Sequence, residues 1–209
     1  MKVQYLDHMG DDLAVVNAAR VSFAKVSHDF NEKDAKLIKY LAKHKHWSPF
    51  SHTCIKLHIE APIFVARQLA KHQVGFAWNE VSRRYVDDAP VFYAPNEWRG
   101  KPVDKKQGSD GSVTLNQDDE MHLQGVYTYT QELYNNMIAK GIAPEQARMI
   151  LPQSMMTQWI WTGNLYGFAR VCQLRLACDT QQETREVAQQ ISDIIAPLFP
   201  VSWEVLNGN

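Results

Sequence analysis

Residues 67–85 read RQLAKHQVGFAWNEVSRRY, a stretch in which cations outnumber carboxylates. Four cations and one carboxylate give it a charge of 4 − 1 = +3, whereas the whole chain has a net charge of −1. The charged residues are Arg67, Lys71, Arg83, Arg84 and Glu80. Guanidinium groups match phosphate oxygens with two parallel hydrogen bonds. The stretch therefore predicts a local binding site for a small, highly charged anion.

Uncharged polar side chains lie within the same stretch. Ser82 offers a hydroxyl group, and Gln68 and Asn79 offer amides that can recognise the polar edge of a ring. A second interpretation is a solvated basic helix end followed by an ordinary strand. Charge alone does not decide between the two interpretations.

The segments around this stretch predict a helix-rich α+β fold with a small, mostly antiparallel sheet. Apolar and polar residues alternate over residues 54–60, which predicts a half-buried strand, and residues 2–7 are expected to form another. Residues 86–116 are rich in proline and glycine and are expected to form a long loop. Helical spacing and capping residues predict helices over residues 11–21, 32–45, 62–72, 118–140, 164–176 and 182–195, with a short helix from Pro144.

Length and composition restrict the class of protein. A chain of 209 residues with 45% hydrophobic and 22% charged residues is expected to form one globular domain over residues 1–209. A net charge of −1 argues against a general coat for nucleic acids or anionic membranes. The chain has no apolar run long enough to span a membrane and no secretion signal, so we expect a cytoplasmic protein.

Cysteine and histidine give no sign of a reactive or metal site. Three cysteines without paired spacing suit a reducing compartment, and none stands in a signature that marks a nucleophile. Four histidines occur between residues 44 and 58, but no carboxylate or thiolate accompanies them at ligand spacing. We therefore expect no metal.

The spelling of residues 67–85 resembles the signature of the flavin-dependent thymidylate synthases. Arg67-Gln68 and residues 79–85, NEVSRRY, match the two ends of that signature. The middle departs from it, because Lys71-His72-Gln73 stands where the family usually has Arg-His-Arg, and the gap to Ser82 is one residue longer. The spelling is similar to divergent members of the family, including members that phages encode.

Weaker matches extend the resemblance over nearly the whole chain. Residues 18–23, AARVSF, and residues 46–52, HWSPFSH, are similar to two segments that line the flavin in the family. Downstream, residues 147–152, ARMILP, and residues 164–175, NLYGFARVCQLR, match further segments. Residues 179–186, DTQQETRE, are similar to a last family element through Gln181, Glu183 and Arg185. Each match is weak alone, but together they keep the family's order and spacing.

The resemblance implies an enzyme that converts dUMP to dTMP. It implies FAD as cofactor, NADPH and methylene-tetrahydrofolate as co-substrates, no cysteine nucleophile, and a homotetramer with shared active sites in the cytoplasm, or the host cytoplasm if a phage encodes the protein. The residues that bind substrate would be Gln68, Glu80, Ser82, Arg83, Arg84, Arg148 and Arg175, with Arg175 also catalytic beside the pyrimidine. The residues that bind cofactor would be Ser22, His46, Ser48, Lys71, His72, Gln73, Asn79, Asn164 and Arg170.

A hypothesis from another class remains open at this point. The chain could be a non-enzymatic protein that binds nucleotides or single-stranded nucleic acid. Phe76 and Trp78 lie beside the basic stretch, and Trp47 lies upstream, so aromatic rings could stack on bases there.

Overall fold

The centre of the protein is a four-stranded sheet in which every neighbouring pair is antiparallel. The computed structural model describes residues 1–104 and 107–208. Its strands lie in the order β1 (Lys2–Met9), β2 (Cys54–Pro62), β6 (Met156–Gly163) and β3 (Phe76–Glu80). The predicted α+β, helix-rich class with a small antiparallel sheet is confirmed.

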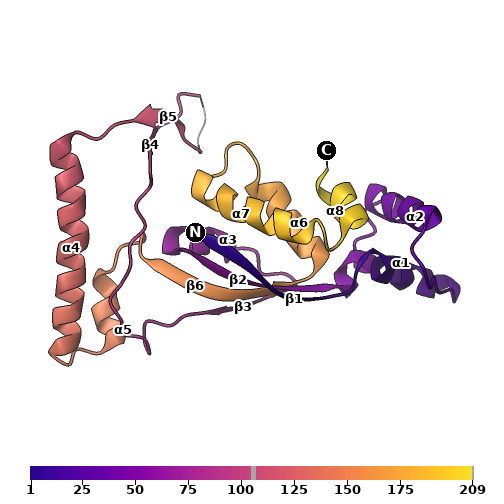
Figure 1. Ribbon diagram of the computed structural model, residues 1–209, viewed down its shortest axis with the longest axis horizontal. Helices are drawn as coiled ribbons and strands as arrows, with labels where there is room; N and C mark the ends of the chain where they lie inside the picture. Colours follow the sequence, from indigo (N-terminus) through magenta and orange to yellow (C-terminus); the bar gives the residue numbers. More distant parts are fainter. Residues whose placement is uncertain (105–106, 209) are drawn as a thin grey trace.

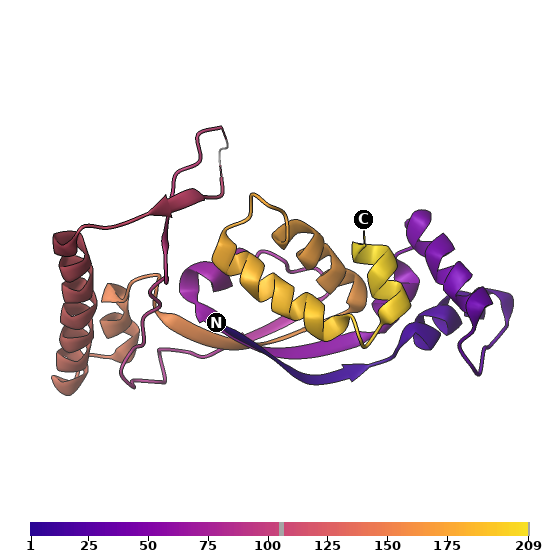
Figure 2. The ribbon, with the colours of Figure 1, turned by 45° about the horizontal axis from the view of Figure 1, so that its top comes forward.

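Helices cover one face of this sheet and extend beyond both of its ends. Figure 1 shows α6, α7 and α8 above the sheet, with α1 and α2 at one end and α4 and α5 at the other. In Figure 2 no helix of the described residues lies over the opposite face. The helices are α1 (Asp12–Arg20), α2 (Glu32–Lys43), α3 (Ile63–Leu69), α4 (Gln117–Ala139), α5 (Pro144–Ala147), α6 (Leu165–Arg175), α7 (Gln182–Ile195) and α8 (Pro200–Asn207).

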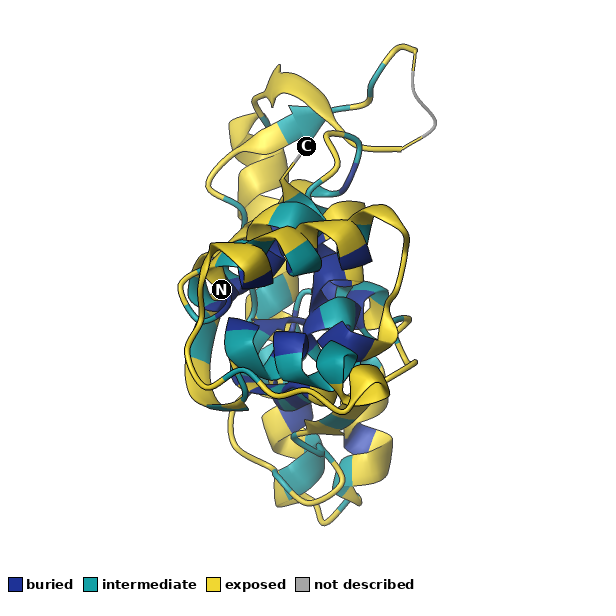
Figure 3. Cartoon of the chain, turned by 90° about the vertical axis from the view of Figure 1, so that its right-hand side faces the viewer, coloured by how far each residue is buried: buried dark blue, intermediate teal, exposed yellow. Residues whose placement is uncertain are grey.

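The hydrophobic core lies between the covered sheet face and the helices. Ile55, Leu57 and Ile59 of β2 are fully buried, as the alternation predicts, and Trp159 and Trp161 of β6 lie on the same face. Viewed from the end that carries α1 and α2, buried residues gather in the middle of the picture and exposed residues surround them (Figure 3). The core thus fixes the sheet and α6 relative to each other.

A close contact joins β3, β6 and the start of α6. The Phe76 ring lies against Gly163, where a Cβ atom would come within 2.3 Å of it. The same ring lies 4.8 Å from Trp161 and 4.9 Å from Phe168, measured between ring centroids. Only glycine leaves room for this aromatic packing, so β3 and α6 are held together at the end of β6.

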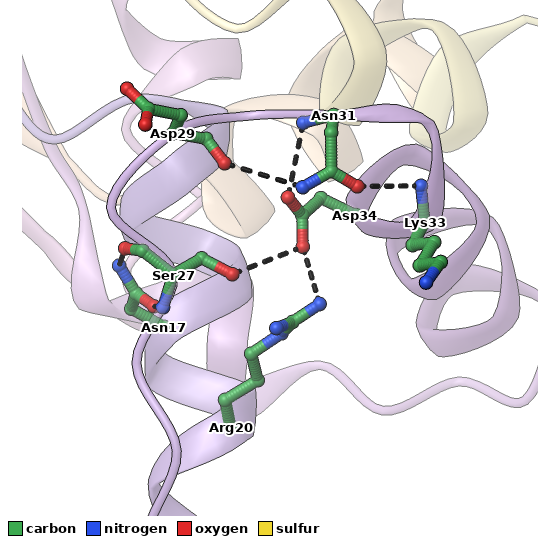
Figure 4. A network of polar contacts seen from close by, with 7 residues as sticks. All are labelled: Asn17, Arg20, Ser27, Asp29, Asn31, Lys33 and Asp34. Carbon is green, nitrogen blue, oxygen red and sulfur yellow. Dashed lines mark hydrogen bonds and ion pairs between the residues drawn. The ribbon is translucent and has the colours of Figure 1, made fainter.

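A buried carboxylate organises the turn between α1 and α2. Asp34 is fully buried and accepts hydrogen bonds from the guanidinium of Arg20, the hydroxyl of Ser27 and the backbone N–H of Asn31 (Figure 4). Asn31 caps α2 in a capping box, as the sequence predicts. Asn17 exchanges two further hydrogen bonds with the backbone of Ser27. These contacts fix the segment over residues 21–31.

Several predictions about the elements need correction. Residues 86–116 are not loop throughout, because β4 (Trp98–Gly100) and β5 (Asp110–Val113) pair within them. The helix after Pro62 ends at Leu69 rather than His72, since the chain must turn back through Gly75, whose φ is +79°, to enter β3. β6 and α8 are absent from the prediction, and β3 occurs there only as the strand of the second interpretation, because apolar and polar residues are mixed in these segments.

The long helix α4 exposes most of its apolar residues. Its helical pattern is confirmed, yet Tyr134 is its only buried residue. Met121, Val126 and Tyr129 are exposed by 63%, 55% and 66%. An exposed apolar helix of this length is typical of a surface that another protein chain covers.

Candidate active site

The arginines of this chain fall into two groups. Arg20 pairs with Asp34 and Arg99 pairs with Glu183, and both carboxylates are buried. Among the described residues no other arginine has a carboxylate oxygen within 4.0 Å. Those without one include Arg83, Arg84, Arg148, Arg170 and Arg175, all of which the sequence places in a binding site. Guanidinium groups without carboxylates are free to bind an anionic ligand.

Arg175, at the end of α6, is held by neutral groups. Its Nε donates to His72 Nε2 at 3.0 Å, and its Nη2 donates to the backbone carbonyl of Gln68 at 3.0 Å. Burial lowers the pKa of Arg175 from its usual value. A guanidinium keeps its proton despite such a shift, so Arg175 presents a fixed positive charge.

His72 must be neutral to make this contact. A ring nitrogen that accepts from Arg175 cannot carry a proton, so the proton of His72 lies on Nδ1. Burial, followed by the positive charges of Arg175 and Arg170, lowers the pKa of His72 below its usual value of 6.5. Three residues that the sequence assigns to a site, Gln68, His72 and Arg175, are thus brought together.

A large cavity opens beside this cluster. Its volume is about 980 Å³, and Gln68 and Arg175 are part of its lining. The other lining residues come mainly from the segment before α4 and from the start of α7, including Tyr93, Trp98, Arg99, Gln181 and Glu183. A cavity of this size can enclose a nucleotide.

Some of the residues predicted to bind cofactor lie at or beside α6. The rings of Trp47 and Tyr166 lie 6.4 Å apart, which brings the segment of His46 and Ser48 to the start of α6. Asn164 caps α6 with its side-chain oxygen, and its amide nitrogen lies beside Gly75. The remaining predicted contacts, Ser22, Lys71, Gln73, Asn79 and Arg170, are exposed.

These positions fit FAD in charge and in access. Lys71 and Arg170 are exposed cations without carboxylate partners among the described residues. Lys71 precedes His72 in the chain, and the charge of Arg170, after burial and the charge of Arg175, lowers the pKa of His72. A diphosphate group requires such cations. The oxygen of Asn164 accepts from Gly167 N at 2.8 Å, and its amide nitrogen makes no hydrogen bond among the described residues, so this nitrogen can donate to a ligand.

The second set of predicted residues, after β3, lies apart from Arg175. Arg83 donates to the carbonyl of Asp88 and lines a different, smaller cavity of about 230 Å³. Arg84 lies over the ring of Tyr85, and Ser82 accepts from the backbone N–H of Arg84. Among the described residues no hydrogen bond or ion pair joins this set to Gln68 or Arg175.

Two further predicted residues are not in contact with Arg175 either. Both oxygens of Glu80 are engaged, one by Thr157 Oγ1 at 2.7 Å and the other by Trp78 Nε1 at 3.2 Å. Arg148 is exposed, and its Nε donates to the carbonyl of Glu145 at 3.3 Å. A single chain therefore brings together only part of the predicted site.

Comparison with known proteins identifies the family. The family model described as "Thymidylate synthase complementing protein" matches residues 4–201. The chain is 38% identical to a flavin-dependent thymidylate synthase of Thermus thermophilus, over 96% of this chain and 73% of the relative. It is 36% identical to one of Thermosipho africanus, over 97% and 89%. The chain belongs to the flavin-dependent thymidylate synthase family.

A solved structure agrees with this assignment to the flavin-dependent thymidylate synthases. The UMP/dUMP methylase PolB from Streptomyces cacaoi, bound with 5-Br dUMP, superimposes with a TM-score of 0.84 at 32% identity, over 98% of this chain and 93% of that chain. The predictions of the family, of an enzyme and of FAD as the family's cofactor are confirmed.

The non-enzymatic hypothesis loses its stacking platform as well. The Phe76 ring packs against Trp161 and Phe168, and the Trp78 ring stacks on Trp159 with their centroids 4.4 Å apart. Two of the three proposed stacking rings are therefore occupied by the protein itself. Trp47 remains exposed, at 57%.

The cysteines differ widely in their surroundings. Cys172 is buried, and this burial raises the pKa of its thiol to about 12, so it stays protonated at neutral pH. Cys54 is partly buried and Cys178 is exposed. Among the described residues no group of three metal-ligating side chains gathers, and no helix is long and apolar enough to cross a bilayer.

The structure adds residues that the sequence does not assign to the site. Gln181 and Glu183 stand in the last family-like segment, but nothing in their spelling shows that they line the cavity. Tyr93 and Arg99 lie in the region predicted as loop, where no periodicity or motif marks them. Only the folded arrangement brings these four residues to Gln68.

Proposed function

We propose that this enzyme reductively methylates dUMP to dTMP, with methylene-tetrahydrofolate as carbon donor and NADPH as the source of reducing equivalents. The observation that carries the proposal is Arg175, which has no carboxylate partner, is held by His72 and the Gln68 carbonyl, and lines a cavity of about 980 Å³. FAD, when bound, supplies the hydride that reduces the methylene unit. Membership of the family and the similarity to a UMP/dUMP methylase support the reaction.

In this proposal Arg175 acts at the edge of the pyrimidine. Negative charge develops on the ring while its C5 carbon attacks, and a fixed guanidinium stabilises that charge. The contacts with His72 and the Gln68 carbonyl hold Arg175 in one orientation, so little reorganisation is needed during the reaction. No cysteine bonds to the base, which is consistent with the protonated thiol of Cys172.

We further propose that each active site combines residues from two chains of a homotetramer. Gln68, His72 and Arg175 would come from one chain, and Ser82, Arg84 and Arg148 from another. The exposed apolar face of α4 supports an assembly, since 66% of Tyr129 and 55% of Val126 are solvent-accessible in the single chain. The separation of the two residue sets within one chain supports the sharing.

The reaction is tested with the purified protein. We expect a flavin absorbance band in the visible range, and formation of dTMP when dUMP, methylene-tetrahydrofolate and NADPH are supplied. Absence of dTMP, together with tight and salt-sensitive binding of oligonucleotides, would support the non-enzymatic hypothesis instead.

The sharing of the site is tested by co-expression of two inactive variants. Arg175→Ala and Arg84→Ala chains together should recover part of the activity, because some sites receive an intact residue set from each chain. Arg175→Ala with Gln68→Ala is the matched control and should stay inactive, since both changes affect the same set. If both mixtures stayed inactive, the result would contradict a shared site.

A further inference from the structure

The chain after β3 forms a loop whose hydrogen bonds to β6 lie only at its two ends. At one end the backbone N–H of Val81 donates to the carbonyl of Gln158 at 3.0 Å, and at the other the N–H of Met156 donates to the carbonyl of Val91 at 2.7 Å. Among the described residues no hydrogen bond joins residues 82–89 to the rest of the chain. A cavity of about 230 Å³ is lined by this loop together with β2 and β6, so the loop does not pack closely on the sheet.

One face of α4 holds the chain where this loop ends. Tyr127, Gln131 and Tyr134 are spaced four and three residues apart, so they lie on the same side of the helix. Tyr127 donates from its hydroxyl to the carbonyl of Tyr93 at 3.3 Å, and Gln131 donates from its amide to the carbonyl of Pro90 at 3.2 Å. Two of the three side chains on this face therefore support the end of the loop.

The third side chain on this face meets the start of the loop through Arg83. The guanidinium carbon of Arg83 lies 5.9 Å from the centre of the Tyr134 ring, and its Nη1 donates to the carbonyl of Asp88 at 2.5 Å. A guanidinium within about 6 Å of the centre of an aromatic ring is attracted by the negative face of that ring. Arg83 therefore closes the loop on itself and attaches it to α4.

The ring of Tyr134, rather than its hydroxyl, makes this contact. Tyr134 is fully buried, and its hydroxyl has no hydrogen-bond partner among the described residues. A buried hydroxyl without a partner lowers stability, so hydrogen bonding gives no reason for a tyrosine at this position. The residue supplies an aromatic face whose position is fixed by its burial.

We propose that Arg83 is a positioning residue that uses the Tyr134 ring to hold residues 82–89 in the conformation that binds the substrate. The proposal rests on the proposed function, in which Ser82 and Arg84 bind dUMP. It gives Arg83 a different role from the direct substrate contact that the resemblance implies. The guanidinium of Arg84 contacts only the exposed Tyr85 among the described residues, so it remains available to a ligand. Of two adjacent cations, one fixes the loop and the other binds.

The test is a series of ring substitutions at position 134 in the complete, flavin-loaded enzyme. Tyr134→Phe removes only the hydroxyl without a partner, and we expect it to bind dUMP like the wild type. Replacement by 4-fluorophenylalanine and then by 3,5-difluorophenylalanine makes the ring face less negative at almost unchanged volume. A loop that holds its binding conformation for only part of the time lowers the apparent affinity by that fraction. The KM for dUMP should therefore rise stepwise, to about 2- to 5-fold, while turnover at saturating dUMP stays the same.

Removal of the cation provides the matched series. In Arg83→Met the affinity for dUMP should fall about 3- to 10-fold, because the ring contact and the hydrogen bond to Asp88 are both lost. Fluorination at position 134 should then have no further effect. Arg83→Lys keeps a cation near the ring and should recover part of the affinity. Lys140→Met removes a cation from the exposed end of α4, controls for the change in net charge, and should bind dUMP like the wild type.

Three outcomes would overturn the inference. Fluorination without effect, together with weak binding in Arg83→Met, would make Arg83 a direct ligand contact. A lowered thermal midpoint with unchanged dUMP affinity would make the contact with Tyr134 purely structural. Equal effects of fluorination with and without Arg83 would show that the ring acts on another group. If the difluorinated chain does not fold, the monofluorinated one decides. A wild-type enzyme that fails to bind dUMP would instead contradict the proposed function.

Discussion

Arg20 and Arg175 occupy similar, partly buried places but have different surroundings. Arg20 lies 2.5 Å from the fully buried carboxylate of Asp34, in a network that fixes the turn between α1 and α2 (Figure 4). Arg175 donates only to the neutral His72 ring and to a backbone carbonyl. The first guanidinium is neutralised by the protein, and the second keeps its charge for a ligand. The comparison separates arginines that stabilise the fold from those that we propose to act on the ligand.

The largest effect is expected for Arg175→Ala. Loss of a well-aligned cation at the developing charge should lower the rate of dTMP formation by about 10²–10³ at saturating dUMP. Arg175→Lys should restore little, because one ammonium group cannot reproduce the planar guanidinium. Single-turnover yield of dTMP and the flavin spectrum are the measurements. Loss of flavin, with normal activity once FAD is added back, would move Arg175 to the cofactor site.

Asp34→Ala addresses the other member of the comparison. Removing the buried carboxylate leaves Arg20 unpaired, and the free energy of unfolding should fall by about 3 kcal/mol, at the lower end for a broken buried pair because Arg20 reaches solvent. Denaturant unfolding of the purified variant measures this effect. Lys33→Ala, an exposed change one residue away, is the control and should have little effect. Unchanged stability in Asp34→Ala would remove the basis for calling Arg20 structural.

Much of this comparison could be predicted from the sequence, though not all of it. The family resemblance of residues 67–85 and 164–175 predicts that Gln68, His72 and Arg175 belong to a site, and the Asn31 cap predicts where α2 begins. The pairing of Arg20 and Arg99 with carboxylates 14 and 84 residues away could not be predicted, since it depends on tertiary packing. The strand β6 also escapes prediction, because its buried face joins Thr157 to two tryptophans rather than to branched aliphatic residues.

A smaller effect is expected from pH. Because the pKa of His72 lies below 6.5, the ring is neutral at pH 7 and becomes protonated only as the pH falls through that lowered value. Protonation removes the acceptor for Arg175 and places two cations together, so activity should decline on the acid side. The unfolded chain takes up this proton at a higher pH, so stability also declines below about pH 6.5.

His72→Gln is the variant that tests this decline. Glutamine can accept from Arg175 but does not titrate, so the acid decline in dTMP formation should begin at a lower pH than in the wild type. The measurement is the pH profile of dTMP formation for both proteins under the same conditions. Superimposable acid limbs would show that another group controls the decline.

The smallest effect is expected when all three cysteines are replaced. The variant with Cys54, Cys172 and Cys178 changed to Ser should still form dTMP, because the proposed mechanism uses no thiol as a nucleophile. The measurement is the rate per flavin-loaded molecule. A hydroxyl in the buried position of Cys172 destabilises the fold, and this rate excludes molecules that have unfolded for that reason. A folded, FAD-loaded triple variant without turnover would contradict the proposed mechanism.

Thermal unfolding with and without saturating dUMP tests the division between the two arginines most directly. A ligand that binds only the folded state raises the unfolding midpoint, and the increase grows with the logarithm of the ratio of ligand concentration to dissociation constant. We predict that Arg175→Ala nearly keeps the midpoint of the free enzyme but shows a reduced increase with dUMP, because one contact to the bound nucleotide is lost. Asp34→Ala should show the reverse, a lowered midpoint with the full increase. A full dUMP response in Arg175→Ala, or its loss in Asp34→Ala, would contradict the division of roles.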